Sequence, residues 1–170
     1  MSTLSRRAHG ASRRASTDGP RAEYLAFKLA GDTYAVRIGS VAEILKPPPI
    51  TDVPRAGRSI VGVVSVRGRL VTVVDLRRRF GLPESAGDAR TRILLVAAGG
   101  EELVGLLVDE VLQVYRLAES EIEPATVLGG EQPAHIIGIG RPASVAASAG
   151  GRRGPETVLV LLDLRPVIEL

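Results

Sequence analysis

The sequence predicts a mostly β protein built from two similar small β-barrels packed together. From residue 21 on, short runs rich in Val, Ile and Leu are interrupted by Gly, Asp and Pro about every eight to twelve residues, as in barrels and sandwiches. The chain also repeats itself, since residues 60–63 match 136–139 and residues 71–77 match 159–165. Each half therefore offers about five strands, and two such halves packed together share a core.

The first half begins with a predicted hairpin that turns at Gly31-Asp32. Val41, Ile44 and Leu45 follow at helical spacing and precede three prolines that end any regular structure. A second hairpin turns at Arg67-Gly68, after which Asp75 can cap a short helix over residues 76–80. The strands predicted in this half are 23–29, 34–38, 60–66 and 70–74.

The second half repeats this arrangement with a longer final hairpin. Asp163 stands after the last strand as Asp75 does, before a short helix within residues 164–170. The offset between the copies grows from 76 to 88 residues across segment 141–156, which is predicted to be a mobile loop. The boundary between a first subdomain (22–90) and a second (91–170) is predicted near residues 83–91. The strands predicted here are 92–97, 103–108, 134–140 and 157–162.

Residues 1–21 are predicted to form a disordered basic tail. Four arginines stand against one aspartate in residues 1–20, so this segment carries the whole net charge of +3 and the remainder is neutral. The segment has almost no large apolar residues with which to offset the entropy of ordering. It is either a plain solvated tail or a weak binding segment for membranes, acidic proteins or nucleic acid.

Catalytic and metal chemistry find little support in the sequence. Cysteine is absent, and His9 and His135 are the only histidines, so no metal site or cofactor is predicted. Phosphate-binding glycine motifs and the nucleophile elbow are also missing. Asp75 and Asp163 invite comparison with a carboxylate pair, but each follows a strand and opens a helical turn, so N-capping explains both. We therefore expect a protein that is not an enzyme.

Nucleic-acid binding and membrane insertion are also disfavoured. Aromatic residues make up 3% of the chain, and Tyr24, Phe27 and Tyr34 lie in predicted core strands without an interleaved basic strip. The run Arg77-Arg78-Arg79 is predicted to be a solvated helix face. Apolar stretches such as residues 158–162 are far shorter than the roughly 20 residues that span a bilayer. A basic β-barrel that binds nucleic acid remains a minor alternative.

Recognition of other proteins is the function that these features favour. Arg67-Gly68-Arg69 forms a hairpin tip between apolar strands, which is the composition of a protein-binding hot spot, although a plain polar turn has the same spacing. Leu25, Ile38 and Val41 exceed what a small barrel core needs, so they form either core or an apolar patch for a partner.

At these residues the sequence resembles the CheW family of chemotaxis coupling proteins, over about residues 22–170. Two departures are visible: Ser65 stands where the family usually has Asn, and segment 141–156 is longer than usual. The stretches that carry the resemblance occur in the family's order and are residues 24–27, 34–36, 41–45, 60–69, 73–76 and 104–111.

The resemblance implies two five-stranded SH3-like barrels without catalysis. It implies an adaptor that couples chemoreceptors, the methyl-accepting chemotaxis proteins, to the regulatory domain of a CheA-type histidine kinase in a cytoplasmic array beneath the inner membrane. It implies no contact with nucleic acid and no membrane insertion. A scaffold in a non-motility pathway of the same type is the alternative. By position, the receptor-facing residues would be Glu43, Arg67, Leu70, Ile93 and Val114. The kinase-facing residues would be Leu25, Ile38 and Val41.

Overall fold

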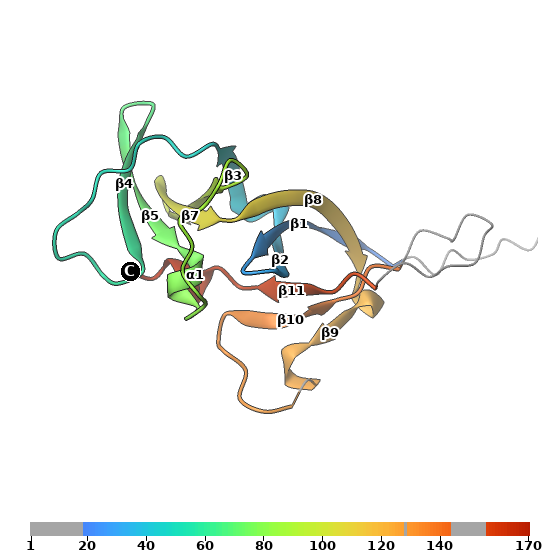
Figure 1. The fold of residues 1–170 in the computed structure, drawn as a ribbon. Helices are drawn as coiled ribbons and strands as arrows, with labels where there is room; N and C mark the ends of the chain where they lie inside the picture. Colours follow the sequence, from blue (N-terminus) through green and yellow to red (C-terminus); the bar gives the residue numbers. More distant parts are fainter. Residues whose placement is uncertain (1–18, 128, 144–155) are drawn as a thin grey trace, which may run out of the picture.

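The computed structural model describes residues 19–127, 129–143 and 156–170, which form two β-sheets (Figure 1). The predicted tail and mobile loop fall mainly on residues 1–18 and 144–155, which lie outside the described residues, whereas Arg21 already belongs to the first strand. One sheet contains β1 (Arg21–Leu29), β2 (Asp32–Arg37), β8 (Glu110–Ala118), β9 (Ile122–Pro124), β10 (Ile136–Gly140) and β11 (Leu159–Leu162). The other contains β3 (Val41–Leu45), β4 (Ile60–Val66), β5 (Arg69–Asp75), β6 (Arg92–Gly99) and β7 (Glu102–Val108).

Short helices join or follow these strands. The two α-helices, α1 (Leu76–Arg79) and α2 (Arg165–Ile168), lie after the last strand of each half, as predicted. Asp75 caps α1 as expected, since its side chain accepts a hydrogen bond from the Arg77 amide. Asp163 accepts a hydrogen bond from the Arg165 amide, but the N-cap of α2 is Leu164, so the predicted cap lies one residue too early. Three 3-10 helices are η1 (Ile38–Ser40), η2 (Glu119–Glu121) and η3 (Ala125–Val127). None of the described helices is long and apolar enough to cross a membrane.

The two sheets have the same strand order, which confirms the internal repeat. The order β8-β1-β2-β11-β10 in one sheet corresponds to β3-β6-β7-β5-β4 in the other, and β9 adds a short sixth strand to the first. We call β1–β2 and β6–β7, which open the two halves, the early hairpins, and β4–β5 and β10–β11, which close them, the late hairpins. In both sheets the second strand of an early hairpin pairs in parallel with the second strand of a late hairpin, β2 with β11 and β7 with β5. The fold is mostly β with two similar subdomains, as predicted, but the hydrogen-bonded order leaves two edge strands in each sheet, so neither barrel is closed.

The predicted boundary near residues 83–91 is wrong, because the two halves exchange their first hairpins. Hairpin β1–β2 pairs with β8 and β11 of the second half, and hairpin β6–β7 pairs with β3 and β5 of the first. The five-stranded sheet therefore spans residues 41–108, and the six-stranded sheet takes strands from both ends of the chain. A repeat shows which strands are alike, but it does not show which of them pair.

Val41, Ile44 and Leu45 stand at helical spacing in the sequence but do not form a helix. These residues form β3, whose register against β6 shifts between Val41 and Glu43. The bulge adds one residue, so positions three apart, Val41 and Ile44, come to lie opposite Val96 and Leu94 of the same core. The register of β8 against β1 shifts in the same way, between Val114, which pairs with Leu25, and Val111, which pairs with Phe27. In both strands a β-bulge imitates the helical period.

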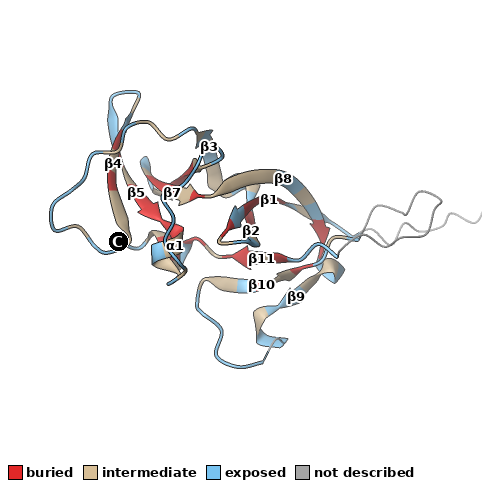
Figure 2. Cartoon of the chain, viewed as in Figure 1, coloured by how far each residue is buried: buried red, intermediate tan, exposed pale blue. Residues whose placement is uncertain are grey.

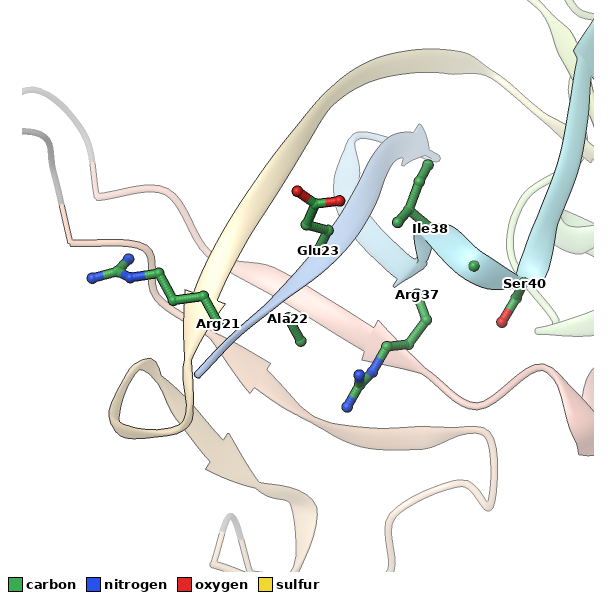
Figure 3. A pocket seen from close by; sticks show the side chains of 7 residues that line it. Arg21, Ala22, Glu23, Arg37, Ile38 and Ser40 are labelled. Atoms are coloured by element: carbon green, nitrogen blue, oxygen red, sulfur yellow. The ribbon is translucent and has the colours of Figure 1, made fainter. Parts of the chain in front are cut away.

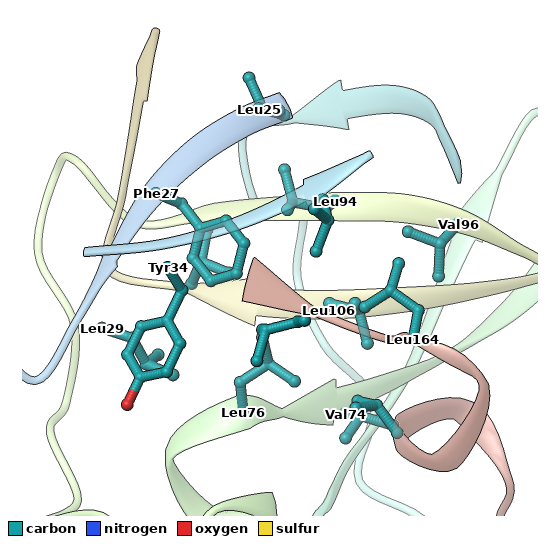
Figure 4. Packing of buried hydrophobic residues seen from close by; sticks show 14 of the residues in the cluster. Leu25, Phe27, Leu29, Tyr34, Val74, Leu76, Leu94, Val96, Leu106 and Leu164 are labelled. Carbon is teal, nitrogen blue, oxygen red and sulfur yellow. The ribbon is translucent and has the colours of Figure 1, made fainter. Parts of the chain in front are cut away.

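One hydrophobic cluster joins the two sheets, as the shared core of the prediction requires. Strands β1 and β2 contribute to it from one sheet and strands β6 and β7 from the other (Figure 4). Leu76 of α1 and Val167 of α2 belong to the same cluster. A smaller cluster fills each sheet on its other side. The predicted core aromatics Tyr24, Phe27 and Tyr34 are all buried. Because the largest cluster lies between the sheets, the subdomains are held as one unit.

Equivalent glycines let a neighbouring segment approach each late hairpin closely. A Cβ on Gly62 would lie closer than 3.0 Å to the carbonyl oxygen of Thr51, whose backbone pairs with Val63. A Cβ on Gly138 would lie 2.5 Å from the carbonyl oxygen of Glu123 in β9. Both obstacles are backbone atoms, so a side chain cannot be accommodated by a rotamer change.

Within the run Arg77-Arg78-Arg79, predicted to be a solvated face, Arg78 is exposed but Arg77 is not. The Arg77 guanidinium donates to both carboxylate oxygens of Asp109, with 2.8 Å between Nε and Oδ1, and to the carbonyl of Pro83. The same carboxylate accepts the amide of Ala30 in the β1–β2 turn at 2.8 Å. The hydrogen bond from Arg77 to Asp109 raises the pKa of Arg77 above its ordinary value. Asp109 thus ties α1, the β7–β8 junction and the exchanged hairpin together.

A row of rings runs from the shared core to the surface. Phe27, Tyr34, Phe80 and His135 follow one another, and the last two stack with ring centroids 4.2 Å apart. Partial burial, together with the charge of nearby Arg79, lowers the pKa of His135 below its ordinary value. Protonation of His135 therefore opposes the folded state.

We expect acid to destabilise the protein partly through His135. With a folded-state pKa below the unfolded value of about 6.5, the folded state binds fewer protons, so stability is full above that value and declines as the pH falls through the lowered pKa. Urea unfolding at about pH 7.5 and about pH 5.5 measures this loss. The variant His135→Phe keeps a ring on Phe80 and should lose less stability between these values. Equal losses in both proteins would contradict this assignment.

Candidate protein-binding site

The β4–β5 hairpin presents an arginine at its tip in an unusual backbone conformation. Arg67 and Gly68 form the turn with φ of 48° and 78°, the left-handed values that a tight two-residue hairpin requires. For a residue with a Cβ this region costs roughly 1–2 kcal/mol, and such residues concentrate at functional sites. The tip is exposed on the molecular surface (Figure 2).

Arg67 is paired with Glu43, a residue predicted for the same face. The Arg67 Nη2 atom lies 2.7 Å from Oε1 of Glu43 on β3, so the hairpin tip is joined to the edge strand of its own sheet. The two side chains are 74% and 31% exposed, so the pair contributes about 1 kcal/mol at most to stability. Its main effect is to orient the guanidinium.

An exposed leucine stands in the same hairpin, three residues after Arg67. Leu70 is 76% exposed and stands opposite Ser65 in the hairpin. Neighbouring Arg69 lies 3.5 Å from Glu101 in the β6–β7 turn. An apolar side chain that stays in water next to an oriented arginine is the combination that protein interfaces use as an anchor.

Two of the predicted contact residues are wrong as contacts because they are buried. Ile93 is fully buried in the cluster inside the five-stranded sheet, and Leu25 is 4% exposed in the cluster between the sheets. Neither side chain can reach a partner in this fold. Leu25 lies opposite the exposed Val114 across a strand pair, and Ile93 lies opposite the partly buried Leu45.

Val114 and a residue that the sequence reasoning missed occupy equivalent places in the two sheets. Val114 on β8 is 45% exposed opposite Leu25, and Ile44 on β3 is 43% exposed opposite Leu94. Both buried partners belong to the shared core. The repeat carries the signal for Ile44, since aligning β3 with β8 places it at the position of Val114.

The remaining two predicted residues lie between core and surface. Ile38 in η1 and Val41 in β3 are half-buried and pack against the shared core. They retain an accessible edge, as a contact patch requires. Leu25 lies in the same cluster beneath the surface.

The described residues contain no group of three or more His, Cys, Asp or Glu side chains that could hold a metal ion. Their one buried charged side chain is Asp75, which accepts the amide of Arg77 as a helix cap. The Arg67 tip thus combines charge, exposure and rigid support.

Comparison with known proteins agrees with this description. The model of the CheW-like domain matches residues 23–169. The chemotaxis protein CheW of Bacillus subtilis is 40% identical over 101 residues, 59% of this chain and 64% of that protein. Protein FrzA of Myxococcus xanthus is 30% identical over 120 residues, 71% and 74% of the two chains. The crystal structure of the scaffolding protein TtCheW from Thermoanaerobacter tengcongensis superposes with a TM-score of 0.73 at 27% identity, covering 88% of this chain and 94% of that one. Since the family model spans both sheets, this chain belongs to the CheW-like family.

Proposed function

We propose that this chain is a non-enzymatic adaptor that couples chemoreceptors to the regulatory domain of a CheA-type histidine kinase in a cytoplasmic chemosensory array. Membership in the CheW-like family, whose named relatives are chemotaxis and scaffolding proteins, supports the adaptor role. The observation that carries the proposal is the rigid, exposed Arg67 tip oriented by Glu43 beside Leu70. Such a surface can bind a protein partner without catalysing a reaction.

The two proposed partners would bind two different surfaces of the chain. The receptor tip would contact Arg67, Glu43, Leu70 and Val114, with buried Ile93 as support beneath them. The kinase domain would contact Ile38 and Val41, with Leu25 beneath. Since one shared core holds both surfaces, an adaptor of this build would keep two partners at a fixed separation.

Arg67→Glu should weaken receptor binding by at least about tenfold while the melting temperature stays nearly unchanged. The reversed charge would repel Glu43 and lose any receptor carboxylate, whereas an exposed pair contributes little to stability. Titration of a soluble cytoplasmic fragment of a chemoreceptor from the same organism, followed by calorimetry, gives the dissociation constant.

Arg55→Glu is a matched control for this experiment. Arg55 is likewise an exposed arginine with a left-handed backbone, at φ 62°, but it lies in the β3–β4 connection. We expect the control to bind the receptor fragment within about twofold of the wild type. If both variants bind equally well, the receptor-facing role of Arg67 is wrong.

A further inference from the structure

A hollow of about 440 Å³ opens beside Ile38, between the start of β1 and η1 (Figure 3). In Figure 3 the side chains of Arg37 and Ser40 extend to one side of it, and those of Glu23 and Ile38 to the other. The hollow therefore joins an apolar residue of the proposed kinase-facing patch to a polar wall. The lining residues are Arg21, Ala22, Glu23, Arg37, Ile38, Gly39 and Ser40.

The charged residues of this lining are not equivalent. Glu23 lies 3.6 Å from the guanidinium of Arg116, and Arg21 lies 3.4 Å from Glu121, so both have an opposite charge nearby. Arg37 differs, because no carboxylate of the described residues comes within ion-pairing distance of it. Its positive charge is thus left for a group from outside.

Arg37 is also held in place before any partner arrives. Its guanidinium carbon lies 5.4 Å from the centroid of the Tyr24 ring, and Tyr24 is buried and pairs with Arg37 across β1 and β2. A cation over an aromatic face is fixed without losing its hydrogen-bond donors at the edge. A preorganised guanidinium loses little side-chain entropy when it binds a carboxylate.

The polar wall suits a single carboxylate. A guanidinium forms short, charge-assisted hydrogen bonds to carboxylate oxygens, and the Ser40 hydroxyl adds a neutral donor on the same side. The methyl group of Ala22 and the absence of a side chain at Gly39 leave space for the methylene groups of Asp or Glu. Ile38 provides an apolar surface for the residue next to it.

We propose that this hollow receives an Asp or Glu side chain of the partner that covers Ile38, with Arg37 as the recognising cation. This inference rests on the proposed function, in which that partner is the kinase regulatory domain. It adds a polar anchor to a patch otherwise made of apolar residues. Charge complementarity sets the register in which the kinase domain docks, and the apolar residues supply buried area.

The test is titration calorimetry of the full chain with the regulatory domain of the CheA-type kinase from the same organism. Arg37→Glu should raise the dissociation constant at least about tenfold, and Arg37→Lys, which keeps the charge, should raise it less. Arg58→Glu changes the net charge equally at an exposed position in the β3–β4 connection and should stay within about twofold. Circular dichroism checks that each variant is folded.

A second measurement distinguishes lost recognition from lost packing over Tyr24. Arg37→Gln keeps most of the side-chain stem, so its binding should be weak at low salt and should depend less on salt than wild-type binding. Suppose that the wild type binds and that both Arg37→Glu and Arg37→Gln match its dissociation constant and its salt dependence. The carboxylate site is then wrong and the adaptor proposal stands. If the wild type itself does not bind the kinase domain, the proposed function is wrong and this inference falls with it.

Discussion

Asp109→Ala is expected to lower the free energy of unfolding by about 2–3 kcal/mol. The substitution leaves the Arg77 guanidinium, whose side chain is 16% exposed, without its carboxylate, and it removes the acceptor of the Ala30 amide. Both losses fall at the junction where hairpin β1–β2 meets α1 and the β7–β8 connection. Because Asp109 is 28% exposed, we expect the lower part of the range measured for buried pairs.

Urea unfolding followed by circular dichroism measures this loss. Glu101→Ala removes an exposed ion pair with Arg69, whose atoms lie 3.5 Å apart, and should cost less than about 0.5 kcal/mol. A double-mutant cycle with Arg77→Met should show a coupling energy above about 1 kcal/mol between Arg77 and Asp109. A loss no greater than that of Glu101→Ala would show that Asp109 does not hold the hairpin.

Gly62→Ala is expected to cost about 2–4 kcal/mol or to prevent folding. Its new Cβ would overlap the carbonyl oxygen of Thr51, so the backbone bridge between Thr51 and Val63 would have to open. Gly138→Ala meets the equivalent obstacle at Glu123 and should lose stability for the same reason. Segment 50–51 would then separate from β4, and β9 would separate from β10.

Thermal and urea unfolding of both variants test this expectation. Gly39→Ala is the control, because nothing lies within 4 Å of its Cβ position. Replacing a glycine at a compatible position changes stability by less than about 1 kcal/mol, usually in the favourable direction. Stability of Gly62→Ala close to that of Gly39→Ala would mean that segment 50–51 moves away without cost.

Most strands and the cap of α1 were predictable because their signals are local. Apolar runs bounded by turn residues predict β4 and β5 almost to the residue, and the Arg67-Gly68 turn was placed correctly between them. Asp75 caps α1 as expected, since its hydrogen bond reaches only two residues along the chain. The repeat likewise predicted that the two subdomains would be alike.

Strand β3 was missed because its signal depends on a partner. The spacing of Val41 and Ile44 is helical in sequence, and only the bulge against β6 brings both to the same side of a strand. The Arg77–Asp109 pair was missed for a related reason, since its members are far apart in the chain and meet only because α1, which follows β5, packs beside the end of β7.

The sequence by itself determined most of the strands, the repeat, the cap at Asp75, the Arg67 turn and the resemblance to the CheW family. Tertiary structure decided the exchange of hairpins, the burial of Leu25 and Ile93, the exposure of Ile44 and the pairing of Arg67 with Glu43. The physical reason is that turns, caps and periodicity depend on near neighbours in the chain. Burial and side-chain partners depend instead on which strands lie side by side, and that choice follows from how both halves together bury one core.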